Sequence, residues 1–268
     1  MGHRDADPQT WDMVSEELAA TLLVLGVRRR QSALSVSSAT LLFNTLRLTP
    51  GVEKAIVEPM ERSCQIYEAL GTARASHQAA AAHYQLALYF SKVWTCQRDE
   101  VKTRDKLAAA FKHYGKAHQY FFNHIKGNET TFILLSLDFS SLYSAVSGEE
   151  CLSKALSCCL DTYMAFSVKV VPAATDEQMK ILEENVESRV SKLLLNLVKI
   201  EKENSSKLKG KQKPLDKYKT MYRKVLEYKT SSSGKVESNS NGDGIEENPS
   251  YPIFKLLKAL YEYDLSKV

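Results

Sequence analysis

The stretch AAAAHYQLALYFSKVWTCQRDEVKTRDKLAAAFKHYGKAHQYFF, residues 79–122, decides the fold class of this chain. Its first part places Ala87 three residues before Phe90, and its second part places Ala117 four residues before Phe121. Residues three and four apart share one face of a helix, so both parts are typical of amphipathic helices. Small residues let two helix backbones approach, and the aromatic ring beside them fills the groove. The stretch therefore predicts two helices folded back on each other as a hairpin.

Related patterns recur along the chain. An apolar–small pair precedes an apolar partner at three places: Leu18-Ala19 with Leu22, Leu86-Ala87 with Phe90, and Phe139-Ser140 with Tyr143. A small residue precedes a partner by four positions at Ala117 and again at Ala155, 38 residues later, close to the tetratricopeptide repeat of about 34 residues. The signature Trp of that repeat is absent. The sequence predicts an all-α fold of degenerate tetratricopeptide-like hairpins stacked as an α-solenoid, with a C-terminal helical extension. The alternative is a generic helical bundle, because any helical hairpin shows such spacings.

The predicted organisation has five segments. They are a tetratricopeptide-like array over residues 1–203, a basic linker at 204–213, a helix at 214–230, a disordered Ser/Asn/Gly-rich segment at 231–250, and a short helix at 251–268. The disorder prediction rests on composition, because such a segment has too few apolar side chains to bury.

Proline, glycine and capping residues predict several helix boundaries. Thr49-Pro50-Gly51 is a joint between helices, and Gly71 closes the helix before it. Pro59 is expected to end one helix or to open another, because proline lacks the N–H that an interior helical position donates. Ser76 is expected to cap the start of the next helix.

A first helix is expected to start after Asp7-Pro8. Its apolar residues lie at intervals of three and four: Trp11, Val14, Leu18, Leu22 and Leu25. This interval places them on one stripe of the helix surface.

Composition indicates a reducing compartment and no membrane span. The five cysteines form no C-x-x-C pair and are best explained as free thiols. The longest apolar run, Ala19–Val27, is shorter than the ~20 residues that a membrane helix needs. The net charge of +4 is mild, although Lys199–Lys229 holds 11 basic and 4 acidic residues. That stretch fits a nuclear-import signal, a contact for an acidic partner, or a solvated linker and helix face.

No pattern in the sequence indicates catalysis or a cofactor. Phosphate-binding glycine loops and nucleophile elbows are absent. Neighbouring histidines such as His77 and His83, or His113 and His118, lie five or six residues apart. Metal ligands on one helix face lie three or four apart, so core or surface histidines are expected instead of a metal site.

A family resemblance supports the repeat interpretation. Asp7-Pro8-Gln9-Thr10-Trp11-Asp12, with Glu16-Glu17-Leu18 after it, resembles a segment of the erythroid differentiation-related factor family. The run Ala80-Ala81-Ala82-His83-Tyr84-Gln85-Leu86-Ala87 does so too, continuing through Lys116-Ala117 and Phe121, and more loosely through 134–167 into the next long helix. This covers most of the chain and corresponds to the C-terminal, tetratricopeptide-like part of that family. The resemblance implies a nuclear protein linked to transcriptional regulation, with no catalytic residues.

We therefore expect a non-enzymatic scaffold that binds protein partners in a groove. The alternative roles are a cytosolic assembly scaffold and, less favoured, a helical protein associated with RNA or DNA. Direct nucleic-acid binding and membrane association are not expected, and the expected location is the nucleus, with the cytoplasm as the alternative. The candidate groove residues are polar side chains near the first helices of the hairpins: Gln78, His83, Gln85, Lys92, Asn128 and Ser136.

Overall fold

A computed structural model describes residues 7–39, 49–97, 100–146, 148–168, 176–207, 217–233 and 251–265. The regular structure within these ranges is entirely helical and contains no strand, so the predicted all-α class is confirmed. No helix in the same ranges is long and apolar enough to cross a membrane. The chain divides into two compact units, Met1–Asn123 and His124–Val268.

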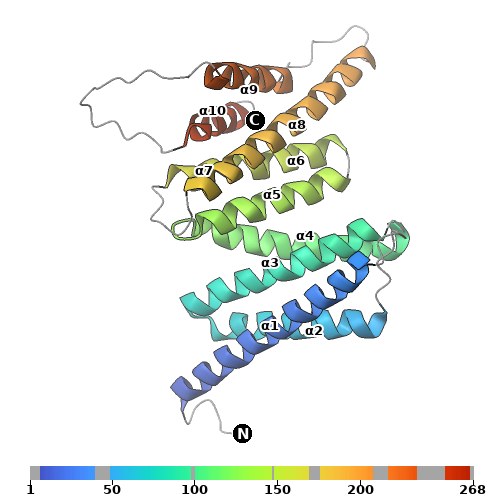
Figure 1. Cartoon of the computed structure of the whole chain (residues 1–268), viewed down its shortest axis with the longest axis vertical. Coiled ribbons are helices and arrows are strands. Elements are labelled where there is room, and N and C mark those ends of the chain that lie inside the picture. The colour runs from blue at the N-terminus through green and yellow to red at the C-terminus, as the bar shows by residue number, and fades with distance from the viewer. Residues whose placement is uncertain are drawn as a thin grey trace, which may run out of the picture. The chain divides into compact units, whose positions relative to one another are not determined.

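The first unit consists of two helix pairs, coloured from blue to green in Figure 1. The first pair is α1 (Pro8–Ala39) with α2 (Pro50–Leu70), and the second is α3 (Ala73–Cys96) with α4 (Glu100–Asn123). The two helices of each pair pack along each other, and α2 also packs against α3. The hairpin predicted from residues 79–122 is α3 with α4.

Small residues bring α1 and α2 close together. A Cβ atom added at Gly26 would collide with the side chain of Met60 and would lie 3.0 Å from the carbonyl oxygen of Ile56. Two helical turns before Gly26, Ala19 is fully buried. The hydroxyl of Ser63 donates a hydrogen bond of 2.7 Å to the carbonyl oxygen of Ala19. The buried face of α1 is therefore built on small residues, which allow the close backbone approach.

Pro59 lies inside α2, so the prediction that it bounds a helix was wrong. A proline at this position leaves the carbonyl oxygen four residues earlier, that of Ala55, without its helical donor. The guanidinium of Arg29, on α1, donates a hydrogen bond of 2.9 Å to that oxygen. The neighbouring helix therefore satisfies the acceptor that the proline frees, and α2 continues to Leu70.

The joint between α2 and α3 is a compact turn. Gly71 adopts a left-handed conformation at φ 66° and ends α2, as its sequence position predicted. The residue that caps α3 is Thr72, whose hydroxyl accepts a hydrogen bond of 3.1 Å from the backbone N–H of Ala75. Ser76 instead lies in the first turn, where its N–H donates to the Thr72 carbonyl. The cap predicted at Ser76 was therefore placed four residues too late.

Helix α3 is buried on one side and accessible on the other. The buried side packs against α2 and α4 with mostly small and aromatic side chains, among them Ala79, Ala82, Leu86, Phe90 and Val93. The other side, which we call the α3 face, remains half-buried or exposed: Arg74, Gln78, Ala81, Gln85, Leu88, Lys92 and Thr95. On α4, Ala117 and Phe121 are fully buried, as the packing pattern predicted.

The second unit consists of the remaining helices. They are α5 (Glu129–Val146), α6 (Glu149–Leu160), α7 (Tyr163–Ser167), α8 (Asp176–Lys207), α9 (Lys217–Ser233) and α10 (Ile253–Leu265). Helix α5 packs on α6, α6 on α8, and α8 on α9, while α10 contacts α6, α7 and α9. The buried apolar side chains of this unit include Phe132, Leu142, Leu156, Leu194 and Leu257.

Segment boundaries predicted near the middle of the chain differ from those of the helices. The array predicted over residues 1–203 extends across both units, because the division between them falls after Asn123. Helix α8 continues to Lys207, so the first four residues of the predicted linker are helical. The rest of that linker, residues 208–213, lies outside the described ranges.

The C-terminal segments are also shifted by a few residues. The helix predicted at 214–230 is α9, which begins at Lys217 and extends to Ser233. Most of the segment predicted as disordered, residues 234–250, lies outside the described ranges. The short helix predicted at 251–268 corresponds to α10.

Candidate functional site

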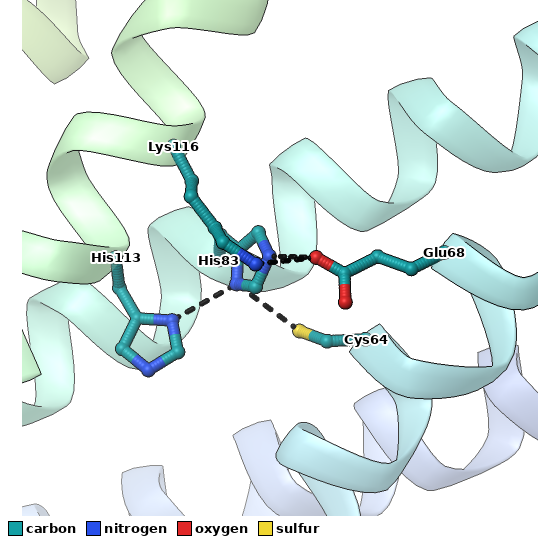
Figure 2. A network of polar contacts seen from close by, with 5 residues as sticks. All are labelled: Cys64, Glu68, His83, His113 and Lys116. Atoms are coloured by element: carbon teal, nitrogen blue, oxygen red, sulfur yellow. Dashed lines mark hydrogen bonds and ion pairs between the residues drawn. The ribbon is translucent and has the colours of Figure 1, made fainter.

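Five polar side chains from three helices meet inside the first unit, and we call this cluster the polar network (Figure 2). Helix α2 contributes Cys64 and Glu68, which lie four residues apart on one face. Helix α3 contributes His83, and α4 contributes His113 and Lys116, which lie three residues apart. The helical spacing directs each pair toward His83, the central residue of the network.

Both ring nitrogens of His83 have polar partners. Its Nε2 lies 3.0 Å from Oε1 of Glu68, and the ammonium of Lys116 lies 2.6 Å from the same oxygen. Its Nδ1 lies 2.9 Å from Nδ1 of His113 and 3.4 Å from Sγ of Cys64. The two histidines and the thiol are buried, while Glu68 and Lys116 are partly exposed at the edge. The network therefore runs from a partly exposed ion pair to side chains that are buried.

The hydrogen-bond partners assign the protons of the two histidines. A carboxylate only accepts, so Nε2 of His83 carries the proton and donates it to Glu68. The Nδ1 of a neutral His83 is then an acceptor, and His113 donates its Nδ1–H there. The Cys64 thiol is a second, weaker donor to the same nitrogen. Every contact in the network is satisfied when both rings are neutral.

Burial keeps the two rings neutral. Desolvation is the main cause that lowers the pKa of His83, and it lowers the pKa of His113 to about 3, with His83 as the next contributor. At the edge, the hydrogen bond from Lys116 lowers the pKa of Glu68. At neutral pH the charges of the network therefore lie at its exposed end.

Cys64, His83 and Glu68 follow the order nucleophile, base and carboxylate, but the thiol lacks the properties of a nucleophile. The Cys64 side chain is only 3% exposed, and burial raises its pKa to about 12. A reactive cysteine needs the opposite, an accessible site that stabilises the thiolate. The arrangement instead suits a hydrogen-bonded connection that holds α2, α3 and α4 in register.

The same donors do not form a metal centre. No group of three or more His, Cys, Asp or Glu residues in the described ranges is arranged to hold a metal ion. The distance of 2.9 Å between the two Nδ1 atoms is that of a hydrogen bond. Two nitrogens bound to one zinc ion at ~2.0–2.1 Å in tetrahedral geometry would lie farther apart.

Thiol reactivity tests this assignment. In the folded chain we expect Cys64, Cys158 and Cys159 to resist alkylation, because all three are buried and burial raises their pKa values. Cys96 and Cys151 are half-buried and should react first. Timed iodoacetamide labelling followed by peptide mass spectrometry measures each rate, with the denatured chain as control. Labelling of Cys64 at the rate found in denaturant would contradict a buried structural role.

Three of the predicted groove residues lie on the accessible side of α3. Gln78, Gln85 and Lys92 are separated by intervals of seven residues, and Lys92 is the most exposed of them. His83 lies on the opposite side, 5% exposed, in the polar network. The prediction that His83 contacts a partner was therefore wrong. His83 and Gln85 are only two residues apart, but this spacing places them on opposite sides of α3.

The other two predicted groove residues belong to the second unit. Asn128 lies in the turn before α5, where its backbone carbonyl accepts the N–H of Phe132 and its side chain donates to the His124 carbonyl. It is a structural turn residue. Ser136 is fully buried within α5, so its predicted role in a partner groove was also wrong.

Sequence reasoning missed four members of the polar network: Cys64, Glu68, His113 and Lys116. Spacing along a single helix does not reveal the central contact of the network, because this contact joins His83 to a residue 30 positions away on another helix. The spacing of Cys64 and Glu68 on α2, and of His113 and Lys116 on α4, could have indicated the network. Each pair places two polar residues beside an otherwise apolar helix face.

Comparison with known proteins gives no match to a protein-family profile, to a curated protein or to a solved structure. The resemblance to the erythroid differentiation-related factor family therefore stays a prediction from the residues quoted above.

Proposed function

We propose that this chain is a non-enzymatic scaffold that binds protein partners, and that the α3 face is its binding surface. The observation that carries the proposal is the side-chain pattern of this face. Gln78, Gln85 and Lys92 recur along one line of α3 at intervals of seven residues, while the opposite side of the helix is buried. The two amides and the ammonium therefore form a row of hydrogen-bonding groups that suits a ligand lying along the helix.

The chemistry of the α3 face suits a peptide or helix that carries a carboxylate. Glutamine amides both donate and accept, so they pair with peptide backbone or polar side chains. Lys92 and Arg74 are its ionised side chains and both are positive, and Arg74 also pairs with Glu16 of α1. Ala81 and Leu88 supply small and apolar contacts between the glutamines.

We further propose that the helix pairs are of the tetratricopeptide type. The packing order, α1 on α2, α2 on α3 and α3 on α4, is consistent with this, as are the buried Ala117 and Phe121. In such repeats the first helix of each pair lines a groove that takes up a peptide or helix. Helix α3 is the first helix of its pair.

The proposed setting is the nucleus, in the regulation of transcription, and its support is the family resemblance of residues 7–18 and 80–121. A cytoplasmic assembly scaffold is the alternative. Imaging of the tagged chain in cells separates them, because exclusion from the nucleus would contradict the proposed setting.

A charge-reversal pair tests the binding surface. The variant Gln85→Glu with Lys92→Glu places two carboxylates on the α3 face, and repulsion from an acidic ligand should reduce captured partner at least about tenfold. The matched control is Lys112→Glu with Gln119→Glu, which makes the same charge change at exposed positions seven residues apart on α4. Quantitative mass spectrometry of proteins captured by each variant, with helicity checked by circular dichroism, gives the comparison. Equal loss in both variants would contradict the α3 face as the binding surface.

A further inference from the structure

Arg30, in the C-terminal third of α1, extends to the middle of α3. Its guanidinium donates a hydrogen bond of 3.1 Å to the backbone carbonyl oxygen of Gln85. Because α3 is helical through this position, the same oxygen also accepts the N–H of Tyr89. The arginine is therefore not needed to satisfy the carbonyl. The contact places its guanidinium beside Gln85, at the centre of the α3 face.

The guanidinium of Arg30 has no anionic partner in the part of the chain that the structure describes. The side chain is half-buried, and burial is the main cause that lowers its pKa. The groups that counteract this shift are the phenols of Tyr114 and Tyr84, whose ring centroids lie 6.2 Å apart. A positive charge is thus held partly out of water, beside neutral groups.

The other half-buried lysine or arginine in the described residues of the first unit is Lys106, which has an anionic partner. Its ammonium pairs with the carboxylate of Glu53 on α2. Such pairing is expected, because removing a charge from water is costly unless an opposite charge compensates it. The Arg30 guanidinium has five N–H donors, and the Gln85 carbonyl accepts from one of its nitrogens. The donors that remain suit the two oxygens of a carboxylate.

The local charge favours an acidic ligand at this position. Helix α3 contains no acidic residue, and α1 contains none after Glu17. Two cations near Arg30 in the sequence pattern are exposed: Lys92, seven residues after Gln85 on the α3 face, and Arg28 on α1. A carboxylate beside Arg30 therefore meets attraction from these charges and no repulsion from side chains of this part of either helix.

We propose that Arg30 binds a carboxylate of the partner segment that lies along the α3 face, the side chain of an aspartate or glutamate. This inference rests on the proposed role of the α3 face. It adds the charge that the ligand must carry and the residue that recognises it. The guanidinium is already held against α3, so it loses little conformational freedom when the carboxylate binds. Arg30 is therefore the residue that makes the surface selective for acidic segments.

Selection of random peptides displayed on phage, with the immobilised full chain as bait, tests the proposal. The unaltered chain should enrich peptides with aspartate or glutamate at one fixed position. Arg30→Gln should abolish this enrichment, and Arg30→Glu should replace it with lysine or arginine at the same position. The matched control is Arg28→Gln, which makes the same charge change at an exposed position of α1 and should keep the acidic preference. Circular dichroism checks the helicity of each bait.

Affinities of one selected peptide measure the contact itself. Replacing its fixed acidic residue with the matching amide should weaken binding to the unaltered chain about tenfold or more, because a charge-assisted hydrogen bond is lost. The same replacement should change binding to Arg30→Gln less than about twofold, since the two groups act as a pair. Fluorescence anisotropy of the labelled peptides gives both ratios.

The outcomes separate this inference from the proposed function. Equal weakening in the two chains, or an unchanged acidic preference with Arg30→Gln, would overturn the role of Arg30 and leave the α3 face as the binding surface. A peptide that tolerates the amide on the unaltered chain would do the same, however the variants fold. Peptides insensitive to Gln85→Glu with Lys92→Glu would instead contradict the α3 face. Absence of any enriched peptide would contradict both.

Discussion

Replacing Phe121 with alanine is expected to lower the free energy of unfolding of the first unit by about 3–5 kcal/mol. The ring is 1% exposed and packs edge-on against His77 of α3, with ring centroids 5.6 Å apart. Fully buried Ala117 lies one turn before it and permits the close approach of α3 and α4. Alanine at position 121 removes the ring and leaves a cavity that backbones held this closely fill only in part. Urea unfolding followed by circular dichroism measures the loss.

The neighbouring Phe122 is the control for this prediction. Its ring is only partly buried and stacks on His118 of the same helix, at 6.2 Å between centroids. Phe122→Ala removes the same atoms and should cost about 1 kcal/mol. Equal losses for the two variants would mean that the small–aromatic pattern does not define the packed face.

Lowering the pH from 7 to 4.5 is expected to destabilise the chain through its buried histidines. Burial lowers the pKa of His113 to about 3 and that of His118 to about 4, against 6.5 for an ordinary histidine. Below pH 6.5 the unfolded chain therefore binds protons that the folded chain does not. The contribution of the two neutral histidines to the free energy of unfolding is fully present above pH 6.5. It falls as the pH drops toward the pKa values of these histidines in the folded chain. At pH 4.5 each histidine should lower the free energy of unfolding by about 2–3 kcal/mol relative to neutral pH.

Comparison of variants isolates each histidine. His113→Asn keeps a donor near the Nδ1 position but binds no proton in this range, so its stability should fall less steeply than that of the unaltered chain. His118→Asn should act in the same way and independently. Carboxyl groups make the same contribution to the pH dependence in all three chains, so it cancels when the chains are compared. This includes Asp161, because burial raises its pKa to about 6 in each of them. Parallel pH profiles for the unaltered chain and both variants would contradict the neutral, buried state of these rings.

Local pattern was sufficient for the helical class and for the α3–α4 hairpin. Ala87 and Phe90 on α3, with Ala117 and Phe121 on α4, are buried as their spacing predicted. Gly71 ends its helix because the left-handed conformation there is one that glycine adopts readily. These features depend on residues within a few positions of each other, which is the range over which sequence pattern is informative.

Features that depend on a second helix were not predictable from local pattern. Pro59 remains inside α2 because Arg29 of another helix donates to the carbonyl that it frees. The apolar residues of α1 lie on one stripe, yet the packed face is built on Ala19 and Gly26, because the close crossing with α2 requires small residues. The sequence predicted His83 as a groove residue, because its actual partners, on α2 and α4, are distant in sequence.

Site-specific photo-cross-linking tests the proposed scaffold role most directly. A benzoylphenylalanine placed at Thr95, on the α3 face beside Lys92, reports on any protein within reach of that surface in the cell and leaves the proposed binding residues in place. The same group at Lys112, exposed on α4, is the control. We expect one discrete cross-linked protein from position 95, lost in the background that carries Gln85→Glu and Lys92→Glu, and none from position 112. Absence of a specific product at position 95, or the same products from both positions, would contradict the α3 face as the binding surface.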